Sequence, residues 1–320
     1  MTSNSPVFEI AIMARVVWDL HSLNNEGSVG NVSEPRTVVL ADGTKSDGVS
    51  GEMLKHIHSA HLWLLGQGTA SFCRGCATLQ PQKADMPENR REAFRGIKTN
   101  AEALDAALRQ CALCDLHGFL VQQPVVARRS TVEFGWAVGV RDNFHREIHL
   151  HARHAVGERQ AREERQERER AQRQAEEEVE VQAQMVYHRP TRSGTYALVT
   201  LFQPWRIGLN EITYQYVQGV ERAARFQLAL RAYAHTFART DGAMTSTRLP
   251  HLEGIEGVVV VGTRRQPVPV LSPLSASYRD EMQALARRTN GLEVHPFGNL
   301  EGLQAALDEM ASRPLVGLRE

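Results

Sequence analysis

Four cysteines form two short pairs, Cys73 with Cys76 and Cys111 with Cys114, and the sequence contains no other cysteine. Two intervening residues let both sulfurs of a pair reach one ion, so two such pairs predict a tetrahedral site with four thiolates. Zinc is the expected ion, and because four cysteines complete its coordination, it would be structural rather than catalytic. An iron–sulfur cluster and unliganded thiols are the alternatives, whereas a cytosolic compartment disfavours disulfides.

The residues from Ser50 to Lys55 have the types and spacing of an anion site. Apolar residues such as Leu54 and Ile57 recur at helical spacing, which predicts a helix with Ser50 as its N-cap. Ser50, Gly51 and Lys55 would then gather at the helix N-terminus, where free N–H groups and the positive end of the helix dipole favour an anion. An ordinary capped helix with one solvated lysine is the alternative.

A second candidate for phosphate binding is the stretch RPTRSG, from Arg189 to Gly194. It combines two guanidinium groups, two hydroxyls and a flexible glycine, which suits contacts with phosphate groups. The apolar pattern of residues 184–203 predicts one strand before this break and one after it. A plain hairpin turn is the alternative interpretation.

Histidines gather in RDNFHREIHLHARH, where they occupy the positions His145, His149, His151 and His154. No acidic residue or cysteine stands among them in a recognised ligand order, so we interpret them as solvated or RNA-facing. The next block, residues 158–180, holds nine Glu and six Arg and is polar on all sides. It predicts an exposed, ion-paired arm.

The element that positions the first candidate loop is a strand near the N-terminus. Apolar residues alternate from Phe8 to Trp18, which predicts a strand with one face in the core and the other available. The polar loop from His21 to Asn31 is expected on the surface, because an apolar interior offers its side chains no partners. A loop rich in N–H groups at the end of a central strand is a common platform for a phosphate-bearing ligand.

Composition sets wider limits. The 320 residues, 42% of them hydrophobic, can bury a large core, and Lys+Arg and Asp+Glu are both 37, so net charge does not indicate a nucleic-acid partner. Neither a basic-then-apolar N-terminus nor a run of about 20 apolar residues occurs, so we expect a soluble, cytoplasmic protein.

The remaining patterns predict an α+β fold. Strands are expected at residues 36–40, 131–140 and 257–263, and helices at 87–110, 210–237, 276–289 and 300–312. The Asp-Gly pairs at Asp42 and Asp47 indicate turns. This order predicts a sheet with helices on one face, as in ferredoxin-like and RRM-type folds.

Four blocks together carry a family resemblance: the first strand with HSLNNEGSVGN, then SGEMLKHIH, QMVYHRPTRSGTYALVT and DGAMTSTRLPHLEGIEGVVVV. In this order and at these distances they resemble the DevR-type autoregulator family of CRISPR-associated proteins, the backbone subunits of type I Cascade within the RAMP superfamily. The resemblance covers nearly the whole chain. The cysteine pairs are not a general feature of that family.

The resemblance implies a hand-shaped, non-enzymatic protein whose RRM-like palm holds guide RNA (crRNA), while the thumb of one subunit lies over the RNA bound by its neighbour. The palm would comprise residues 1–65, 125–145 and 184–320, with a zinc-stapled insertion at 66–124 and a charged thumb or arm at 146–183. It would grip phosphates and sugars and leave the bases to pair with target DNA. Its other partners would be further copies in a helical filament, a guide-end-capping subunit and a large subunit, with no membrane.

The residues expected to contact RNA on this interpretation carry charged, amide, imidazole or hydroxyl groups, or are glycine. In the palm they are Arg15, Asn24, Asn25, Lys45, Ser50, Gly51, Lys55 and His56; at the base of the thumb, Arg189, Thr191, Arg192 and Ser193; in a third loop, Thr245, Thr247 and Arg248.

Two other functions compete with this one. A metal-dependent ribonuclease of the same superfamily would use Asp19, His21 and the histidines from His145 to His154, yet no paired carboxylates at two-metal spacing accompany them. A CRISPR-linked transcriptional regulator would require a DNA-reading helix, and no helix shows a helix-turn-helix pattern.

Overall fold

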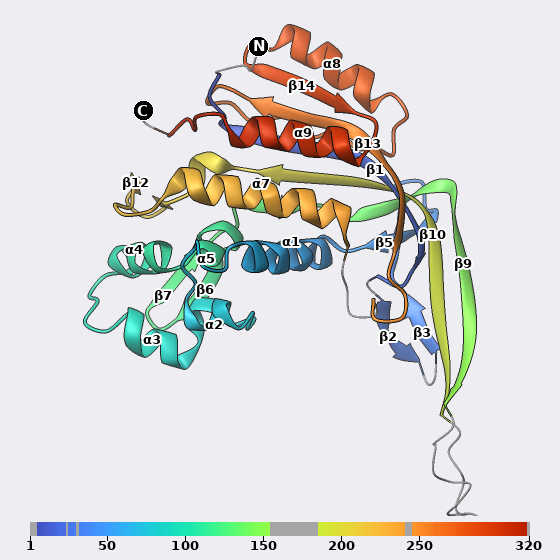
Figure 1. The fold of residues 1–320 in the computed structure, drawn as a ribbon, viewed down its shortest axis with the longest axis horizontal. Coiled ribbons are helices and arrows are strands. Elements are labelled where there is room, and N and C mark those ends of the chain that lie inside the picture. Colours follow the sequence, from blue (N-terminus) through green and yellow to red (C-terminus); the bar gives the residue numbers. More distant parts are fainter. Residues whose placement is uncertain (1–4, 24, 30–31, 154–184, 241–244, 319–320) are drawn as a thin grey trace, which may run out of the picture.

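The computed structural model describes residues 5–23, 25–29, 32–153, 185–240 and 245–318. Within these ranges ten strands form one sheet, and its main path runs β14-β13-β1-β10-β9-β5-β4 with antiparallel neighbours throughout (Figure 1). The strands of this path are β1 (Glu9–His21), β4 (Thr37–Val39), β5 (Lys45–Val49), β9 (Ala137–Arg153), β10 (Met185–Phe202), β13 (His251–Gly262) and β14 (Leu292–Phe297). Off the path, β3 (Val32–Pro35) and β8 (Val132–Phe134) pair with β10, and β2 (Asn25–Val29) pairs with β3.

Strand β1 lies at the centre of the sheet and is covered on both faces. Ile12 and Trp18 pack into the larger core, and Ala11 and Met13 on the opposite face pack into a second core with Val258. The sequence predicted one available face; this is wrong, because Ala11 and Met13 are completely buried. A small residue and a flexible thioether fit a tightly packed second layer.

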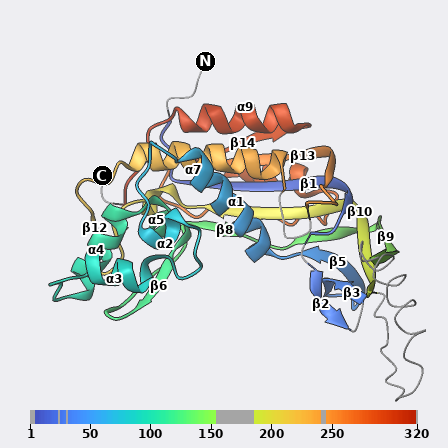
Figure 2. The ribbon, with the colours of Figure 1, turned by 60° about the horizontal axis from the view of Figure 1, so that its bottom comes forward.

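Helices cover both faces of the sheet. On one face α1 (Gly51–Leu65), α7 (Arg222–Ala238) and α9 (Leu300–Ala311) pack side by side over the larger core, as Figures 1 and 2 show. Helix α8 (Tyr278–Arg288) covers the second core on the other face through Tyr278 and Met282. The sequence predicted helices on one face of the sheet only. This is wrong, because three helices cover one face and α8 covers the other.

A lobe built from residues 71–128 lies beside α1 and α7. It contains α2 (Arg74–Ala77), η1 (Lys83–Asp85), α3 (Pro87–Ala93), α4 (Asn100–Gln110), α5 (Ala112–His117) and the hairpin of β6 (Phe119–Gln122) with β7 (Val125–Arg128). The helix predicted over 87–110 is two helices, α3 and α4. The chain turns between them at Gly96, whose φ of 77° favours glycine, and Thr99 caps α4.

Strands β9 and β10 continue away from the helix layers as a long ribbon, which we call the arm, formed by residues 144–153 and 185–193, with β3 paired to it at His188 (Figure 1). The RPTRSG stretch lies within β10, so the predicted pair of strands with a break is wrong. Pairing with β9 and β1 outweighs the local turn signal. Gly194 serves a close approach, because a Cβ there would lie 2.4 Å from the Asn143 carbonyl oxygen.

Three further expectations differ from the structure. Helix α7 begins at Arg222 rather than near 210, because residues 204–216 form η2 (Pro204–Arg206) and the hairpin of β11 (Leu209–Asn210) with β12 (Gln215–Tyr216). Asp47 and Gly48 lie within β5 and make no turn, whereas Gly43 does turn, at φ 82°. Strand β14 was not predicted, and its Pro296 on an edge strand explains the weak signal.

Candidate nucleic-acid interface and metal centre

An open cleft of about 490 Å³ lies where the arm leaves the sheet. Its walls come from the end of β1, from both arm strands and from the residues that lead into β13. The lining residues are Leu20, His149, Thr191, Thr245, Ser246, Thr247, Arg248, Leu249 and His251. Four of these, Thr191, Thr245, Thr247 and Arg248, are residues that the sequence assigned to RNA from separate segments.

The arm side of this arm-base cleft is held by short contacts. The imidazole Nε2 of His149 lies 2.8 Å from the hydroxyl of Thr191 across the β9–β10 pair. Leu20 adopts a left-handed φ of 53° at the end of β1, and its N–H donates to the Ser193 hydroxyl at 3.0 Å. This local conformation turns an apolar side chain, 53% exposed, into the cleft.

Thr191 and Arg192 diverge although they are adjacent. Side chains alternate across a strand, so Thr191 faces the cleft while Arg192 faces β5 on the other side. There the Arg192 guanidinium bonds both oxygens of Asp47, and the Arg192 side chain is only 1% exposed. In this position Arg192 joins two strands and presents no surface to a polyanion.

A buried hydrogen-bonded chain continues from this ion pair. The Tyr196 hydroxyl donates to Asp47 at 2.6 Å and accepts from Nε2 of His21 at 2.8 Å, while Nδ1 of His21 accepts the Leu23 N–H. Burial, and then the charge of Arg192, hold the pKa of His21 well below its usual value. The expectation that His21 and Ser22 lie on the surface is wrong, because Tyr196 and the Pro190 carbonyl supply their partners.

The other predicted RNA contacts are spread over the molecule. Arg15 is anchored to the Pro273 and Ser275 carbonyls on the α8 face, and Ser50 is a buried N-cap that accepts the Met53 N–H. Lys55 is half-buried, and burial, followed by the charge of nearby Lys83, lowers its pKa.

The remaining predicted positions differ in exposure. Gly51 is buried against the Phe134 carbonyl, and His56 is exposed on α1. Lys45 lines a hollow of about 290 Å³ with Arg146, on the face of the arm base that Arg192 occupies. Asn24 and the side chains of Asn25 and Arg189 fall outside the described residues.

The four cysteines converge in the lobe, as their spacing predicted. Their sulfurs lie within 4.8 Å of one another, and the Cys114 sulfur is 3.8 Å from that of Cys73 and 3.7 Å from that of Cys76. A disulfide needs about 2.05 Å, whereas four sulfurs at about 2.3 Å from a tetrahedral ion are about 3.8 Å apart. The cluster therefore has the spacing of a metal site, and all four cysteines are buried.

The surroundings of the cysteines also suit a cation. Cys111 accepts the Cys114 N–H at 3.3 Å, and Cys73 and Cys111 are the N-cap residues of α2 and α5. Hydrogen bonds from Cys111, Cys114 and Cys76 lower the pKa of Cys73, while hydrogen bonding to Cys111 raises the pKa of Cys76 and Cys114. A divalent ion would stabilise all four sulfurs in the charged form. Among the described residues, this is the only group of three or more His, Cys, Asp or Glu side chains close enough for a metal.

Sequence reasoning missed two buried networks that attach the lobe to the rest of the fold. Asp115 accepts bonds from Arg128 at 2.7 Å and Arg225 of α7 at 2.8 Å. His117 bonds Nδ1 of His58 at 2.9 Å, and Nε2 of His58 meets the Ala229 carbonyl at 3.1 Å. The cleft residues that the sequence analysis did not single out are Leu20, Ser246, Leu249 and His251. They lacked a local signal because only the tertiary fold places them there.

Comparison with known protein families identifies the family of this chain. The model of the family described as CRISPR-associated negative auto-regulator DevR/Csa2 matches residues 12–283. The chain belongs to this family. The comparison with curated proteins finds no match.

One of two similar solved structures has a TM-score above 0.5 and shares the fold. A chain of a complex titled "CRISPR RNA-guided surveillance complex, pre-nicking" has a TM-score of 0.52 and 12% identity, over 95% of this chain and 99% of that one. Another, titled "CRISPR RNA-guided surveillance complex", has a TM-score of 0.46 and 14% identity, over 95% and 98%. In the described part of the chain, no helix combines the length and apolarity needed to cross a membrane.

Proposed function

We propose that this DevR/Csa2-family chain is a backbone subunit of a Cascade-type complex that binds guide RNA in the arm-base cleft. The observation that carries the proposal is the cleft itself. Hydroxyls of Thr191, Ser246 and Thr247 and imidazoles of His149 and His251 meet there from segments far apart in the sequence. Hydroxyl and imidazole groups bind phosphates and ribose hydroxyls without reading base edges, which a subunit repeated along arbitrary sequences requires.

The connection of the elements supports an RRM-like palm. In chain order the core is β1, α1, β8 with β9, β10, α7 and β13, and the spatial order is β13-β1-β10-β9 with α1 and α7 on one face. This is the order of the split βαβ arrangement of ferredoxin-like folds. The arm then corresponds to a thumb that projects from the palm.

The cleft explains why one subunit alone would hold RNA weakly. Its lining contains one arginine, Arg248, and otherwise hydroxyl, imidazole and leucine side chains. Each subunit would neutralise few phosphate charges of the RNA. Tight binding of the guide would then come from many subunits bound along the same RNA. Further copies in a helical filament, a guide-end-capping subunit, a large subunit and target DNA paired to the guide are the expected partners.

We propose that the subunit holds RNA without cleaving it. His21, which a ribonuclease would need in a solvent-accessible position, is buried and bonded to Tyr196. Incubation of the purified protein with end-labelled RNA and Mg²⁺ or Mn²⁺ should leave the RNA intact, and cleavage would establish the ribonuclease alternative.

The cluster of four cysteines we assign to a structural zinc ion. The sulfur spacing of 3.7 to 3.8 Å fits its tetrahedral shell, and the four ligands leave no position for substrate. The ion would join α2 to the α4–α5 junction and so stabilise the lobe against α1 and α7.

The arm-base cleft is tested by adding negative charge to exposed hydroxyl positions. Ser246→Glu and Thr247→Glu should each weaken binding of a fluorescein-labelled guide-length RNA by about tenfold at physiological salt, because a carboxylate repels phosphate. Ser277→Glu, at the start of α8 where an acid suits the helix dipole, is the matched control and should leave binding unchanged. Equal affinities for all three variants, or tighter binding of duplex DNA than of RNA, would contradict the assignment.

A further inference from the structure

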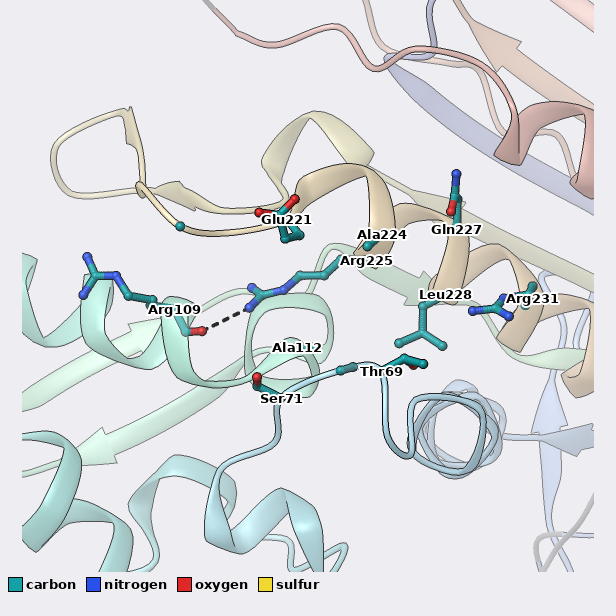
Figure 3. Close-up of a pocket in the computed structure, with 12 residues that line it drawn as sticks. Thr69, Ser71, Arg109, Ala112, Glu221, Ala224, Arg225, Gln227, Leu228 and Arg231 are labelled. Atoms are coloured by element: carbon teal, nitrogen blue, oxygen red, sulfur yellow. Dashed lines mark hydrogen bonds between the residues drawn. The ribbon is translucent and has the colours of Figure 1, made fainter.

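A further cavity, of about 190 Å³, lies in the lobe region, at the end of the helix layer away from the arm. Three segments form it: the connection after α1, the α4–α5 junction and the first turns of α7, as Figure 3 shows. We call it the lobe socket. None of its lining residues takes part in the arm-base cleft or the cysteine cluster.

The socket combines an apolar floor with positive charge. Leu228 and Ala112 are buried in its floor, and Arg225 crosses it to the Arg109 carbonyl at 3.3 Å. Arg231 is exposed and points across the opening toward Leu228 and Thr69 (Figure 3). Within the described residues, the Arg231 guanidinium has neither an ion pair nor a hydrogen bond.

The charges around the socket do not cancel. Arg225 is paired with Asp115, which also pairs with Arg128. Arg128 meets Glu211 as well, but Glu211 is shared with Arg206, so two carboxylates serve three guanidinium groups. Arg109 and Arg231 add two positive charges to the rim, against Glu221 as the acidic residue of the lining. The local field therefore favours an anionic group.

The shape decides between a protein and a nucleic acid as the source of that group. A sugar–phosphate chain needs an open groove with several cations in a row, whereas this cavity is small and has the buried Leu228 and Ala112 in its floor. A partner protein could place one apolar side chain on the apolar floor and an adjacent carboxylate against the arginines of the rim. Contacts of this kind occur at the centre of protein interfaces.

The cysteine cluster gives the socket its fixed wall. Ala112, next to Cys111, donates its N–H to the Ser71 carbonyl at 2.9 Å, two residues before Cys73. A metal that joins both cysteine pairs would therefore hold the α1–α2 connection against the α4–α5 junction. The metal would therefore shape the wall of the socket as well as stabilise the lobe.

We propose that the lobe socket binds an acidic segment of a partner protein, with an apolar side chain on Leu228 and a carboxylate on Arg231. The proposal is independent of RNA binding in the arm-base cleft. It assigns a protein-docking role to the lobe, whereas the cleft assigns RNA binding to the base of the arm.

The probe for this site is a fluorescein-labelled peptide of alternating glutamate and leucine with blocked ends. The full-length protein should bind it saturably below about 1 mM. Arg231→Glu should weaken binding by about tenfold, because one charge pair is lost and reversed. Arg287→Glu, the same change at an exposed position on α8, is the matched control and should bind as the unmodified protein does.

Filling the cavity provides a second test that does not depend on charge. Ala224→Trp would place an indole in the socket, while Ala223→Trp is exposed one position earlier on α7 and does not line it. Only the first should abolish peptide binding, and both should leave RNA affinity unchanged. Equal binding of a peptide with glutamine in place of glutamate, displacement by oligouridylate, or loss of binding with both tryptophan variants would overturn the proposal.

Discussion

Arg192 and Asp47 form an ion pair that is almost completely buried where the arm leaves the sheet. Nη1 of Arg192 lies 3.0 and 3.1 Å from the two carboxylate oxygens, and each side chain is 1% exposed. Tyr196 donates a further hydrogen bond to the same carboxylate. The pair thus ties β5 to β10, and it fixes the direction in which the arm starts.

Removing the carboxylate should destabilise the protein strongly. Asp47→Ala leaves the Arg192 charge buried without a counter-ion, so the free energy of unfolding should fall by about 3 to 5 kcal/mol. Asp42→Ala, at an exposed turn where Asp42 bonds Thr44 and pairs with Arg141, should lower the free energy of unfolding far less, because solvent screens an exposed charge. Urea unfolding monitored by circular dichroism measures both, and similar losses for the two variants would show that the Arg192–Asp47 pair is not buried in solution.

Three buried histidines predict a loss of stability in mild acid. Burial lowers the pKa of His58 to about 3, and burial also holds the pKa of His21 and His117 well below their usual value. In the unfolded chain each histidine has a pKa of about 6.5. Below that pH the histidines of the unfolded chain bind protons while the buried histidines of the folded protein stay neutral. Acid therefore stabilises the unfolded state relative to the folded state.

The free energy of unfolding should accordingly be level above about pH 7 and fall as the pH drops below about 6.5, with up to about 1.4 kcal/mol per pH unit from each histidine. Urea midpoints at a series of pH values measure this slope. Replacing His21 by Asn should reduce the slope by the share of one histidine, whereas replacing the exposed His56 should leave it unchanged. A slope equal in all three proteins would contradict the burial of His21.

Metal removal should loosen the lobe. Zinc binding to four thiolates contributes folding free energy directly, so a strong chelator or Cys111→Ser should lower the thermal midpoint and expose the lobe to proteolysis. The purified protein should contain one zinc per chain by elemental analysis. Adding Zn²⁺ back should restore the midpoint and Mg²⁺ should not, while an unchanged midpoint after chelation would argue for unliganded thiols.

The sequence predicted the features that depend on local chemistry. Ser50 as the N-cap of α1 and the convergence of the two cysteine pairs follow from short spacings. It could not predict that RPTRSG continues as a strand or that His21 is buried, because Arg192 and His21 find their partners, Asp47 and Tyr196, far along the chain. The arm-base cleft was foreseen as separate loops, and only the pairing of β10 with β1 and β9 brings its walls together.

Gly51 shows how a residue first considered for RNA binding can instead be required by packing. A Cβ at this position would lie 2.2 Å from the Phe134 carbonyl oxygen, closer than van der Waals contact permits. Alanine normally stabilises a helix by about 1 kcal/mol relative to glycine, but here the clash between α1 and β8 should outweigh that gain. Gly51→Ala should therefore lower the free energy of unfolding.

Gly298→Ala is the matched control, because a Cβ there meets nothing within 4 Å and its φ is not in the left-handed region. It should be neutral or slightly stabilising in urea unfolding. At a temperature where both variants are folded, both should bind guide-length RNA as the unmodified protein does. Weaker RNA binding by folded Gly51→Ala alone would instead place the N-terminus of α1 in the RNA interface, because the added methyl group would then obstruct the ligand rather than the fold.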